Sequence, residues 1–310
     1  MRRLAAEQGI ALDGLFAPDG GYAASDFATF LAAYERMSRV FEDPETYADL
    51  AYSVLAGQAA HGVIYSEIFL SPPSLFEGDV GRWEAMRQAV ERGADRAEEA
   101  HGILCRLIPV LIRHHGSEAG AEGAAAILRA PRGRIRGFGL AGEERVLSPA
   151  DFAKPFRAAA EAGLRLTAHA GEWAGPESVR AALDDLGPER IGHGVRAIED
   201  PSLVARIAAE GVFLETCPGS NVALGVFPTL AAHPVDRLRD ADVRLSVSTD
   251  DPPFFRTDMT KEYDGLARAF GWGAEDFAGL AAAAFEASFL EAEARPGLAA
   301  RLDAALAACQ

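Results

Sequence analysis

The sequence predicts an α/β protein with the architecture of a single (β/α)8 barrel of the TIM type. Short apolar runs alternate with amphipathic, alanine-rich stretches along the 310 residues, and polar side chains follow the ends of several apolar runs. Repeated β-α units form a parallel sheet covered by helices, and the carboxyl ends of barrel strands form the catalytic mouth. A doubly wound sheet would place a ligand similarly. The barrel is preferred because the sequence has no G-x-G-x-x-G after its first strand and no Walker A motif.

Seven apolar runs are expected to form the strands of this sheet. Segments of helical period, such as PESVRAALDDLG and PSLVARIAAEG, separate most of them. Several helices end in a glycine just before the next strand, as helix C-caps do: Gly62, Gly102, Gly163 and Gly211. In order along the chain, the expected strands are residues 63–70, 103–112, 135–140, 164–169, 190–193, 212–216 and 244–248.

A (β/α)8 barrel needs eight strands, and the first of them is not found in this sequence. Residues 1–20 resemble a helix followed by a turn, so the chain is expected to begin on the helix that follows a first strand. No low-complexity or Pro/Ser-rich linker divides the sequence. We therefore expect one domain, residues 1–310, that is N-terminally truncated relative to a complete barrel.

The composition narrows the classes of partner. A formal net charge of −16 argues against binding nucleic acid or an anionic membrane through bulk electrostatics, since both need a basic face. The three cysteines lie far apart and form no C-x-x-C pair, which suits a reducing cytosol. The sequence has neither a run of 18 apolar residues nor a signal-peptide core. A cytoplasmic protein is expected, and the composition leaves a homo-oligomer open.

The segment LRLTAHAGEWAGP, residues 164–176, is the first candidate site. A buried strand ends in His169, and Gly171 frees the backbone so that Glu172 can turn toward whatever His169 faces. A lone histidine at a strand end is more often a satisfied structural residue, but the imidazole and the carboxylate together favour a function.

Asp250 and Asp251 follow the last strand in RLSVSTDDPPF. Two adjacent carboxylates repel each other and are costly to bury unless a cation or a hydrogen-bond donor holds each one. A metal on one and a substrate on the other would satisfy both, whereas the structural alternative is a capped turn before Pro252. His193 lies between two glycines in RIGHG, where a ligand could approach or a turn could pack. Such elements at one end of successive β-α units are hard to explain by packing alone.

The remaining histidines are weaker candidates. His61, His101 and His233 are interpreted as structural or surface residues, because the first two precede helix-ending glycines and the third lies in a loop. His114 and His115 follow the second expected strand and could border the mouth.

Four motifs together resemble the adenosine/adenine deaminase family of the metal-dependent amidohydrolase superfamily. They are HAGE (169–172), RIGHG (190–194), CPGSN (217–221) and STDDP (248–252), in the family's order and approximate spacing. GFGLAGEE (137–144) resembles the family's glycine-bearing loop, DFATFLAAY (26–34) its helical lid, and GVIYSEIFLSP (62–72) its second strand. The resemblance extends from about residue 1 to the late 280s.

The resemblance implies a role for each matching residue. His169 and Asp250 match metal ligands, normally of one Zn²⁺ per chain, although another divalent metal would suit them. Glu172 matches the acid that protonates the purine N1, and His193 the residue that orients and assists the attacking hydroxide. The remaining matches concern substrate binding: Asp251 to the purine N7, the Gly142 backbone to N3, and Phe30 and Leu31 to apolar lid positions.

These implied roles agree with the chemistry of deamination at the purine C6. Bound Zn²⁺ lowers the pKa of its water from 15.7 to about 7, which supplies a nucleophile at neutral pH. A protonated carboxyl at N1 neutralises the charge that develops on attack, so Glu172 needs a raised pKa. Asp251 would also need to be protonated, or N7 to carry a proton. The H-x-E…P-C-x-x-C signature of cytidine-deaminase-type zinc sites is missing.

The family's first strand carries His-x-His, two further metal ligands, and this sequence contains no His-x-His. One lost N-terminal segment of about 20 residues, through a late start site or a trimmed chain, would explain both the missing strand and the missing ligands. Catalytic zinc usually has three protein ligands, so weak metal binding and poor activity are expected of this chain.

The substrate expected from the local residues is a purine nucleoside, with adenosine hydrolysed to inosine and ammonia. Adenine-specific members tend to carry Asp where this chain has Gly192, and DSSE where it has AGEE; TDMTKEY (257–263) also resembles the nucleoside branch. The alternatives are adenine deamination, another aminopurine nucleoside, and a catalytically impaired barrel that survives as a binding protein.

Overall fold

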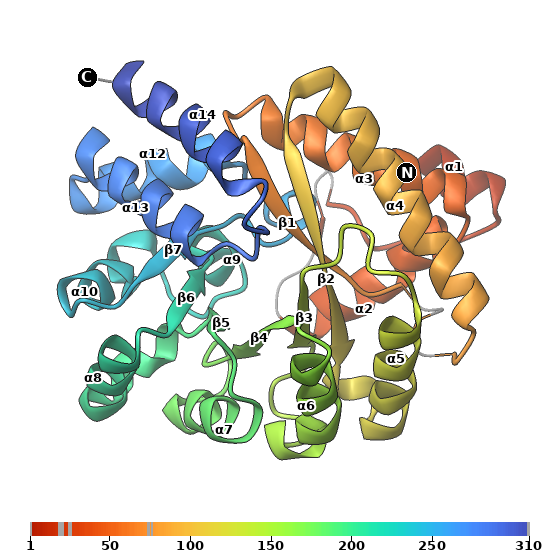
Figure 1. The fold of residues 1–310 in the computed structure, drawn as a ribbon, viewed down its shortest axis with the longest axis horizontal. Helices are drawn as coiled ribbons and strands as arrows, with labels where there is room; N and C mark the ends of the chain where they lie inside the picture. The colour runs from red at the N-terminus through yellow and green to blue at the C-terminus, as the bar shows by residue number, and fades with distance from the viewer. Residues whose placement is uncertain (1, 18–21, 24–26, 73–74, 76, 309–310) are drawn as a thin grey trace.

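The computed structural model describes residues 2–17, 22–23, 27–72, 75 and 77–308. Its centre is a seven-stranded parallel sheet in which the strands follow one another in sequence order, β1 to β7. Helices surround the curled sheet (Figure 1). The strands are β1 (Tyr65–Leu70), β2 (Leu104–Ile112), β3 (Gly137–Ala141), β4 (Arg165–Ala170), β5 (Arg190–His193), β6 (Phe213–Thr216) and β7 (Leu245–Val247).

The predicted α/β barrel fold is confirmed, and each expected strand coincides with an observed one to within about two residues at either end. β1 and β3 each begin two residues later than expected; β3 begins at Gly137, since Ile135 makes only an isolated bridge to Leu107. Gly102 and Gly211 cap their helices in the left-handed conformation, as predicted. β1 and β7 are the outer strands of this sheet, and no described residue pairs one with the other.

Helices follow the strands in the β-α order that the sequence predicts. The first three, α1 to α3, precede β1, and α3 packs against α4 beside it (Figure 1). The helices are α1 (Arg2–Glu7), α2 (Phe27–Ser38), α3 (Pro44–Ala59), α4 (Val80–His101), α5 (Ser117–Arg129), α6 (Ala153–Glu161), α7 (Pro176–Leu186), α8 (Pro201–Glu210), α9 (Pro218–Ala223), α10 (Val235–Asp240), α11 (Pro252–Phe255), α12 (Met259–Phe270), α13 (Ala274–Ala287) and α14 (Arg295–Ala308).

The core lies between the sheet and this ring of helices. β2 is buried at every residue except its two ends, because helices cover one face of the sheet and side chains from the other strands fill the interior. Phe138 of β3 packs edge-on against Phe156 of α6, with ring centroids 5.1 Å apart. The sheet is therefore a rigid frame for the loops at its carboxyl ends.

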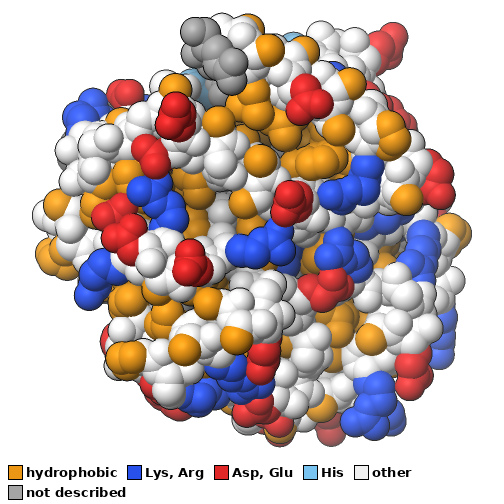
Figure 2. Space-filling view, turned by 60° about the vertical axis from the view of Figure 1, so that its left-hand side comes forward, with side chains coloured by type: hydrophobic (Ala, Val, Ile, Leu, Met, Phe, Trp, Pro, Cys, Tyr) orange, Lys and Arg blue, Asp and Glu red, His pale blue; other side chains and the backbone are white. Residues whose placement is uncertain are grey.

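The surface mixes charges of both signs. On the face in Figure 2, acidic and basic side chains are interspersed with apolar ones. None of the described helices is both long and apolar enough to cross a membrane.

Candidate active site

His169 and His193 lie side by side at the carboxyl end of the sheet. The strand register pairs Ala170 with His193, so the two imidazole rings meet edge to face with centroids 5.0 Å apart. Gly192 makes room for this arrangement, since a Cβ there would lie 2.9 Å from His169 Nδ1. The glycine before His193 thus serves the packing of the neighbouring histidine.

The loops after β4 and β7 bring two carboxylates to His193. Its Nε2 lies 3.6 Å from Glu172 Oε2 and 3.9 Å from Asp250 Oδ2. The Ser220 hydroxyl donates to Asp250 Oδ2 at 2.6 Å and orients that carboxylate. Three residues from three different strand ends therefore meet at one point, as the sequence predicts.

Two of these residues have a strained backbone. His193 and Asp250 have φ values of 58° and 56°, in the left-handed region that non-glycine residues seldom adopt. Such strain costs on the order of 1–3 kcal/mol and persists where the surroundings enforce it, often at functional sites. Both of these residues lie at the mouth of the sheet.

Burial and mutual repulsion favour the protonated form of two acids of the site. The pKa of Glu172 is raised well above its ordinary value, first because the side chain is removed from water and then by the charges of Asp250 and Glu144. Desolvation and the adjacent Asp250 likewise raise the pKa of Asp251. A protonated carboxyl can donate a hydrogen bond, so a raised pKa favours a donor role for each of these acids.

His169 and Asp250 supply two donors of kinds that bind a divalent metal ion, one fewer than catalytic zinc usually has. Burial lowers the pKa of His169 to about 4, which leaves the imidazole neutral, and its buried Nδ1 has no hydrogen-bond partner among the described residues. The neutral imidazole of His169 and the carboxylate of Asp250 are ligand types that zinc accepts.

Cys217 is a further group at this point. Its Sγ lies within 4.8 Å of ligand atoms of His193 and Asp250. Burial and the nearby carboxylates raise the pKa of this thiol well above its ordinary value, whereas a metal binds the thiolate. The Cys217 thiol is therefore held in its neutral form.

Glu144 anchors the loop that carries Glu172. Its buried carboxylate accepts hydrogen bonds from four consecutive backbone N–H groups, those of residues 171–174, and from the Ser178 hydroxyl. The loop has no other regular structure at this point, so Glu144 determines the direction in which Glu172 leaves the strand.

Asn221 connects the two central residues of the site. Its side-chain amide donates to Glu172 Oε1 at 3.0 Å and contacts His193 Nδ1 at 3.3 Å. His233, which the sequence places in a structural or surface role, is 2% exposed and contacts Asn221 Oδ1 at 3.1 Å.

Helix α2 lies over the mouth, where the resemblance implies a lid. Phe30 is buried and contacts Phe254 and Phe255 of α11, each with a ring-centroid separation of 5.2 Å. Leu31 is partly buried in the same apolar cluster. The cluster adjoins Asp251, which precedes α11, so Phe30 and Leu31 lie beside this end of the site.

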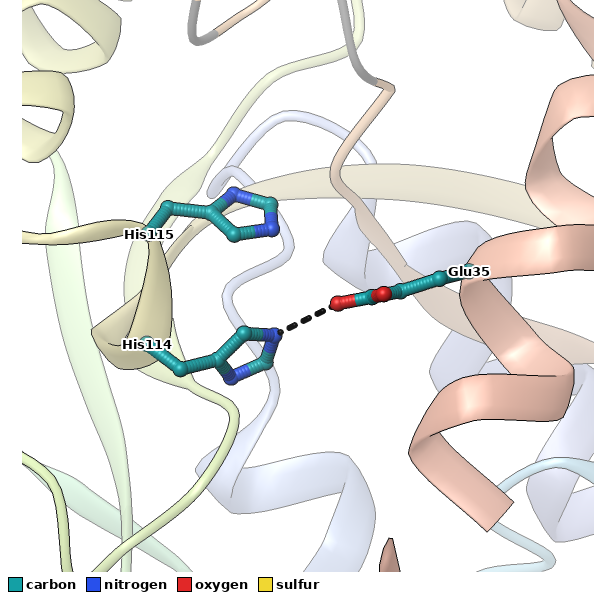
Figure 3. Close-up of side chains that lie close together, drawn as sticks. All are labelled: Glu35, His114 and His115. Atoms are coloured by element: carbon teal, nitrogen blue, oxygen red, sulfur yellow. Dashed lines mark ion pairs between the residues drawn. The ribbon is translucent and has the colours of Figure 1, made fainter. Parts of the chain in front are cut away.

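A second group of side chains joins the lid to the strand ends. Figure 3 shows Glu35 of α2 facing His114 and His115, with 3.3 Å between Glu35 Oε1 and His114 Nε2. His114 Nδ1 accepts the backbone N–H of Glu143, so its Nε2 carries the proton that points at Glu35. The contact is therefore a link between lid and mouth. It adjoins Gly142, where a Cβ would lie 2.8 Å from His114 Nδ1.

The residues at the centre of the site are predictable from the sequence, whereas those that orient them are not. Asn221 and Ser220 lie in the CPGSN motif, which by itself indicates no role for the asparagine. Glu144 lies in AGEE, which in the sequence resembles a marker of the substrate. His233 has no local pattern that could reveal it, since its partner is 12 residues away.

Comparison with known proteins identifies relatives of this chain. The family model for adenosine deaminase matches residues 21–305. The adenine deaminase of Rhizobium johnstonii is 46% identical over 284 residues, covering 92% of this chain and 88% of the relative. That of Agrobacterium fabrum is 45% identical over 301 residues, covering 96% and 91%.

Solved structures of similar fold include another adenine deaminase. The crystal structure of adenine deaminase from Arthrobacter aurescens has a TM-score of 0.86 and 29% identity, covering 97% of this chain and 92% of that one. An amidohydrolase from Burkholderia ambifaria, solved with bound Zn, has a TM-score of 0.84 and 24% identity, covering 99% and 88%.

The expected preference for adenosine is wrong. These relatives are named adenine deaminases, and their alignments with this chain cover more than nine-tenths of it. The three local markers that favoured the nucleoside have structural tasks instead. Gly192 makes room for His169, and Glu144 of AGEE anchors the loop of Glu172. In TDMTKEY, Glu262 is buried and accepts the N–H of Gly219.

The order of the strands, the site at their carboxyl ends, the family model and the identity to adenine deaminases all lead to one assignment. This chain belongs to the adenosine deaminase family, within the metal-dependent amidohydrolase superfamily.

Proposed function

We propose that this chain hydrolyses adenine to hypoxanthine and ammonia. The observation that carries the proposal is the buried Glu172, whose pKa is raised, beside His193 and Asp250 in a chain 46% identical to an adenine deaminase. Water adds at C6, the bond between C6 and the amino nitrogen breaks, and the amino group leaves as ammonia. The substrate is a small aminopurine, and neither nucleic acid nor a membrane is expected as a partner.

Glu172 is the general acid in this scheme. As water attacks C6, electron density moves onto N1, and the carboxyl proton of Glu172 passes to that nitrogen. Its raised pKa keeps the proton available at neutral pH. Asn221 holds Oε1 by its amide, so the remaining oxygen of Glu172 is directed toward His193 and the reacting centre.

His169 and Asp250 would hold the metal, for which Zn²⁺ is the proposed ion. A divalent ion held there acidifies water, which supplies the nucleophile at neutral pH. The Burkholderia amidohydrolase was solved with bound Zn, which supports the choice of metal. His193 contacts both carboxylates and would orient the attacking oxygen.

The other matched residues would hold the purine. The protonated carboxyl of Asp251 can donate to N7, which removes the need for a proton on the base itself. The backbone of Gly142, directly after β3, would contact N3. Phe30 and Leu31 would exclude water from this side of the site.

A steady-state assay of the purified chain, loaded with Zn²⁺, tests this function. Ammonia release with adenine should exceed that with adenosine in kcat/KM, and Glu172→Gln should lower kcat by about 10²–10⁴, the usual contribution of a general acid. Preference for adenosine would overturn the substrate. Tight adenine binding with no turnover would instead support a binding protein that has lost catalysis.

A further inference from the structure

The surroundings of His233 determine which of its two ring nitrogens carries the proton. The residue lies just before α10 and is 2% exposed. Its Nδ1 accepts the backbone N–H of Val235 at 3.2 Å. A neutral imidazole carries one N–H, so an accepting Nδ1 means that Nε2 bears the proton. Burial lowers the pKa of His233 to about 3, so the ring stays neutral.

The proton on Nε2 of His233 determines the orientation of the Asn221 amide. Nε2–H of His233 points at Asn221 at 3.1 Å, so the atom that it meets must be the carbonyl oxygen Oδ1. The Nδ2 group then faces Glu172 Oε1 and His193 Nδ1. The flipped amide would bring two donors together at His233, and such a contact in the buried interior costs about 1–3 kcal/mol.

The orientation of the Asn221 amide in turn determines the tautomer of His193. Asn221 Nδ2 donates to His193 Nδ1 at 3.3 Å, so that nitrogen accepts and Nε2 carries the proton. Nε2 is the atom that faces Glu172 and Asp250. A fixed backbone donor at Val235 thus sets, through two side chains, which nitrogen of His193 is protonated.

We propose that His233 is a positioning residue, which fixes the Asn221 amide and thereby presents His193 to the reacting centre as a hydrogen-bond donor through Nε2–H. His193 then stabilises the oxygen that adds to C6 and does not act as the base that removes a proton from water. This role rests on the proposed function, but the tautomer of His193 is a property of the resting protein.

The test uses the full chain and two variants of His233. His233→Gln keeps an N–H donor close to the position of Nε2, whereas His233→Phe keeps the ring and removes the donor. His101→Phe is the control, because His101 is exposed at the end of α4 and its ring contacts the Tyr52 hydroxyl of α3. Long-range ¹⁵N–¹H NMR of the imidazoles reports the tautomer, and steady-state kinetics report kcat and KM for adenine.

We expect the Nε2–H tautomer of His193 in the unmodified chain, in His233→Gln and in the control. His233→Phe should give a mixture of tautomers and a kcat about 10–100-fold lower with little change in KM, in the range typical of outer-shell substitutions. A proton on Nδ1 of His193 in the unmodified chain would overturn the proposal. So would an unchanged tautomer and kcat in folded His233→Phe.

Failure of the proposed function looks different. If adenine is not hydrolysed, steady-state kinetics give no information, but the NMR measurement still shows which tautomer His193 adopts. If His233→Phe does not fold, as judged by circular dichroism, the tautomer in the unmodified chain and in His233→Gln carries the test: Nδ1–H in either refutes the proposal.

Discussion

Single residues in this site owe their behaviour to partners that lie far away in the sequence. Glu144 accepts four backbone N–H groups from the loop after β4 and the Ser178 hydroxyl of α7, although 27 residues separate it from the first of these groups. Glu172, His193 and Asp250 come from three strands, and Asn221 and His233 orient them from two further segments.

This dispersal explains what the sequence could predict at residue level. His169, Glu172, His193 and Asp250 lie at or just after the carboxyl ends of strands, where polar residues are conspicuous. Glu144 and Asn221 could not be assigned, because their tasks depend on hydrogen bonds between distant loops. The substrate was predicted wrongly for the same reason, since Gly192 and Glu144 looked like markers of the substrate and serve packing and anchoring.

Replacing Glu144 with glutamine should loosen the loop of Glu172. The new NH₂ group would face N–H donors that now bond a carboxylate, so we expect a loss of about 1.5–3 kcal/mol in the free energy of unfolding. Urea denaturation measures this loss. The control is Glu161→Gln, at an exposed carboxyl at the end of α6. Equal stability of the two variants would refute the anchoring role.

At the level of elements, strand ends and helix caps were the most predictable features. All seven strands follow from apolar runs bounded by glycine and polar residues, and their parallel order follows from the helices between them. Register was not predictable, yet it decides the site: pairing of Ala170 with His193 sets His169 against Gly192. Because residue 192 is a glycine and has no Cβ, the imidazoles of His169 and His193 can come into contact.

Alanine in place of Gly192 should therefore disturb the metal site. Its Cβ would lie 2.9 Å from Nδ1 and 3.1 Å from Cγ of His169, and the strand backbone cannot retreat, so the ring must shift. We expect the affinity for Zn²⁺, measured by chelator competition, to fall about 10–100-fold. Gly57→Ala in α3, where nothing lies within 4 Å of the added methyl, is the control and should leave the affinity unchanged. An unaltered affinity in Gly192→Ala would contradict this geometry.

On the scale of the whole molecule, a network of buried and half-buried charges joins the sheet to the segment after α13. Arg190 of β5 is 4% exposed, lies 2.6 Å from Glu67 of β1, and stacks on Phe289 with 3.4 Å from Cζ to the ring centroid. Glu291 bonds Arg106 of β2 and Arg136. Removing one partner of a buried pair leaves an uncompensated charge, so these contacts secure the strands against one another.

This network predicts a pH dependence of stability. The hydrogen bonds from Arg106 and then Arg136 lower the pKa of Glu291 to about 2 from an ordinary value of 4.5. A lowered folded-state pKa adds stability that is complete above the ordinary value and is lost as pH falls through the folded value. Glu291→Gln should therefore be less stable than the unmodified chain at pH 7, and the difference should shrink as pH falls from about 4.5 to about 2.

Urea denaturation at several pH values measures this difference, with Glu293→Gln, at an exposed carboxyl, as the control. A difference that stays constant from neutral to acid pH would show that the pairs with Arg106 and Arg136 do not account for it.

The central claim is that the chain uses water to replace the amino group of adenine. Turnover of adenine by the Zn²⁺-loaded chain in ¹⁸O-labelled water, followed by mass spectrometry of the product, tests it most directly. We expect hypoxanthine that carries one ¹⁸O atom together with an equal amount of ammonia, and loss of both in Glu172→Gln. Unlabelled product, or inosine from adenosine as the only product formed, would contradict the claim.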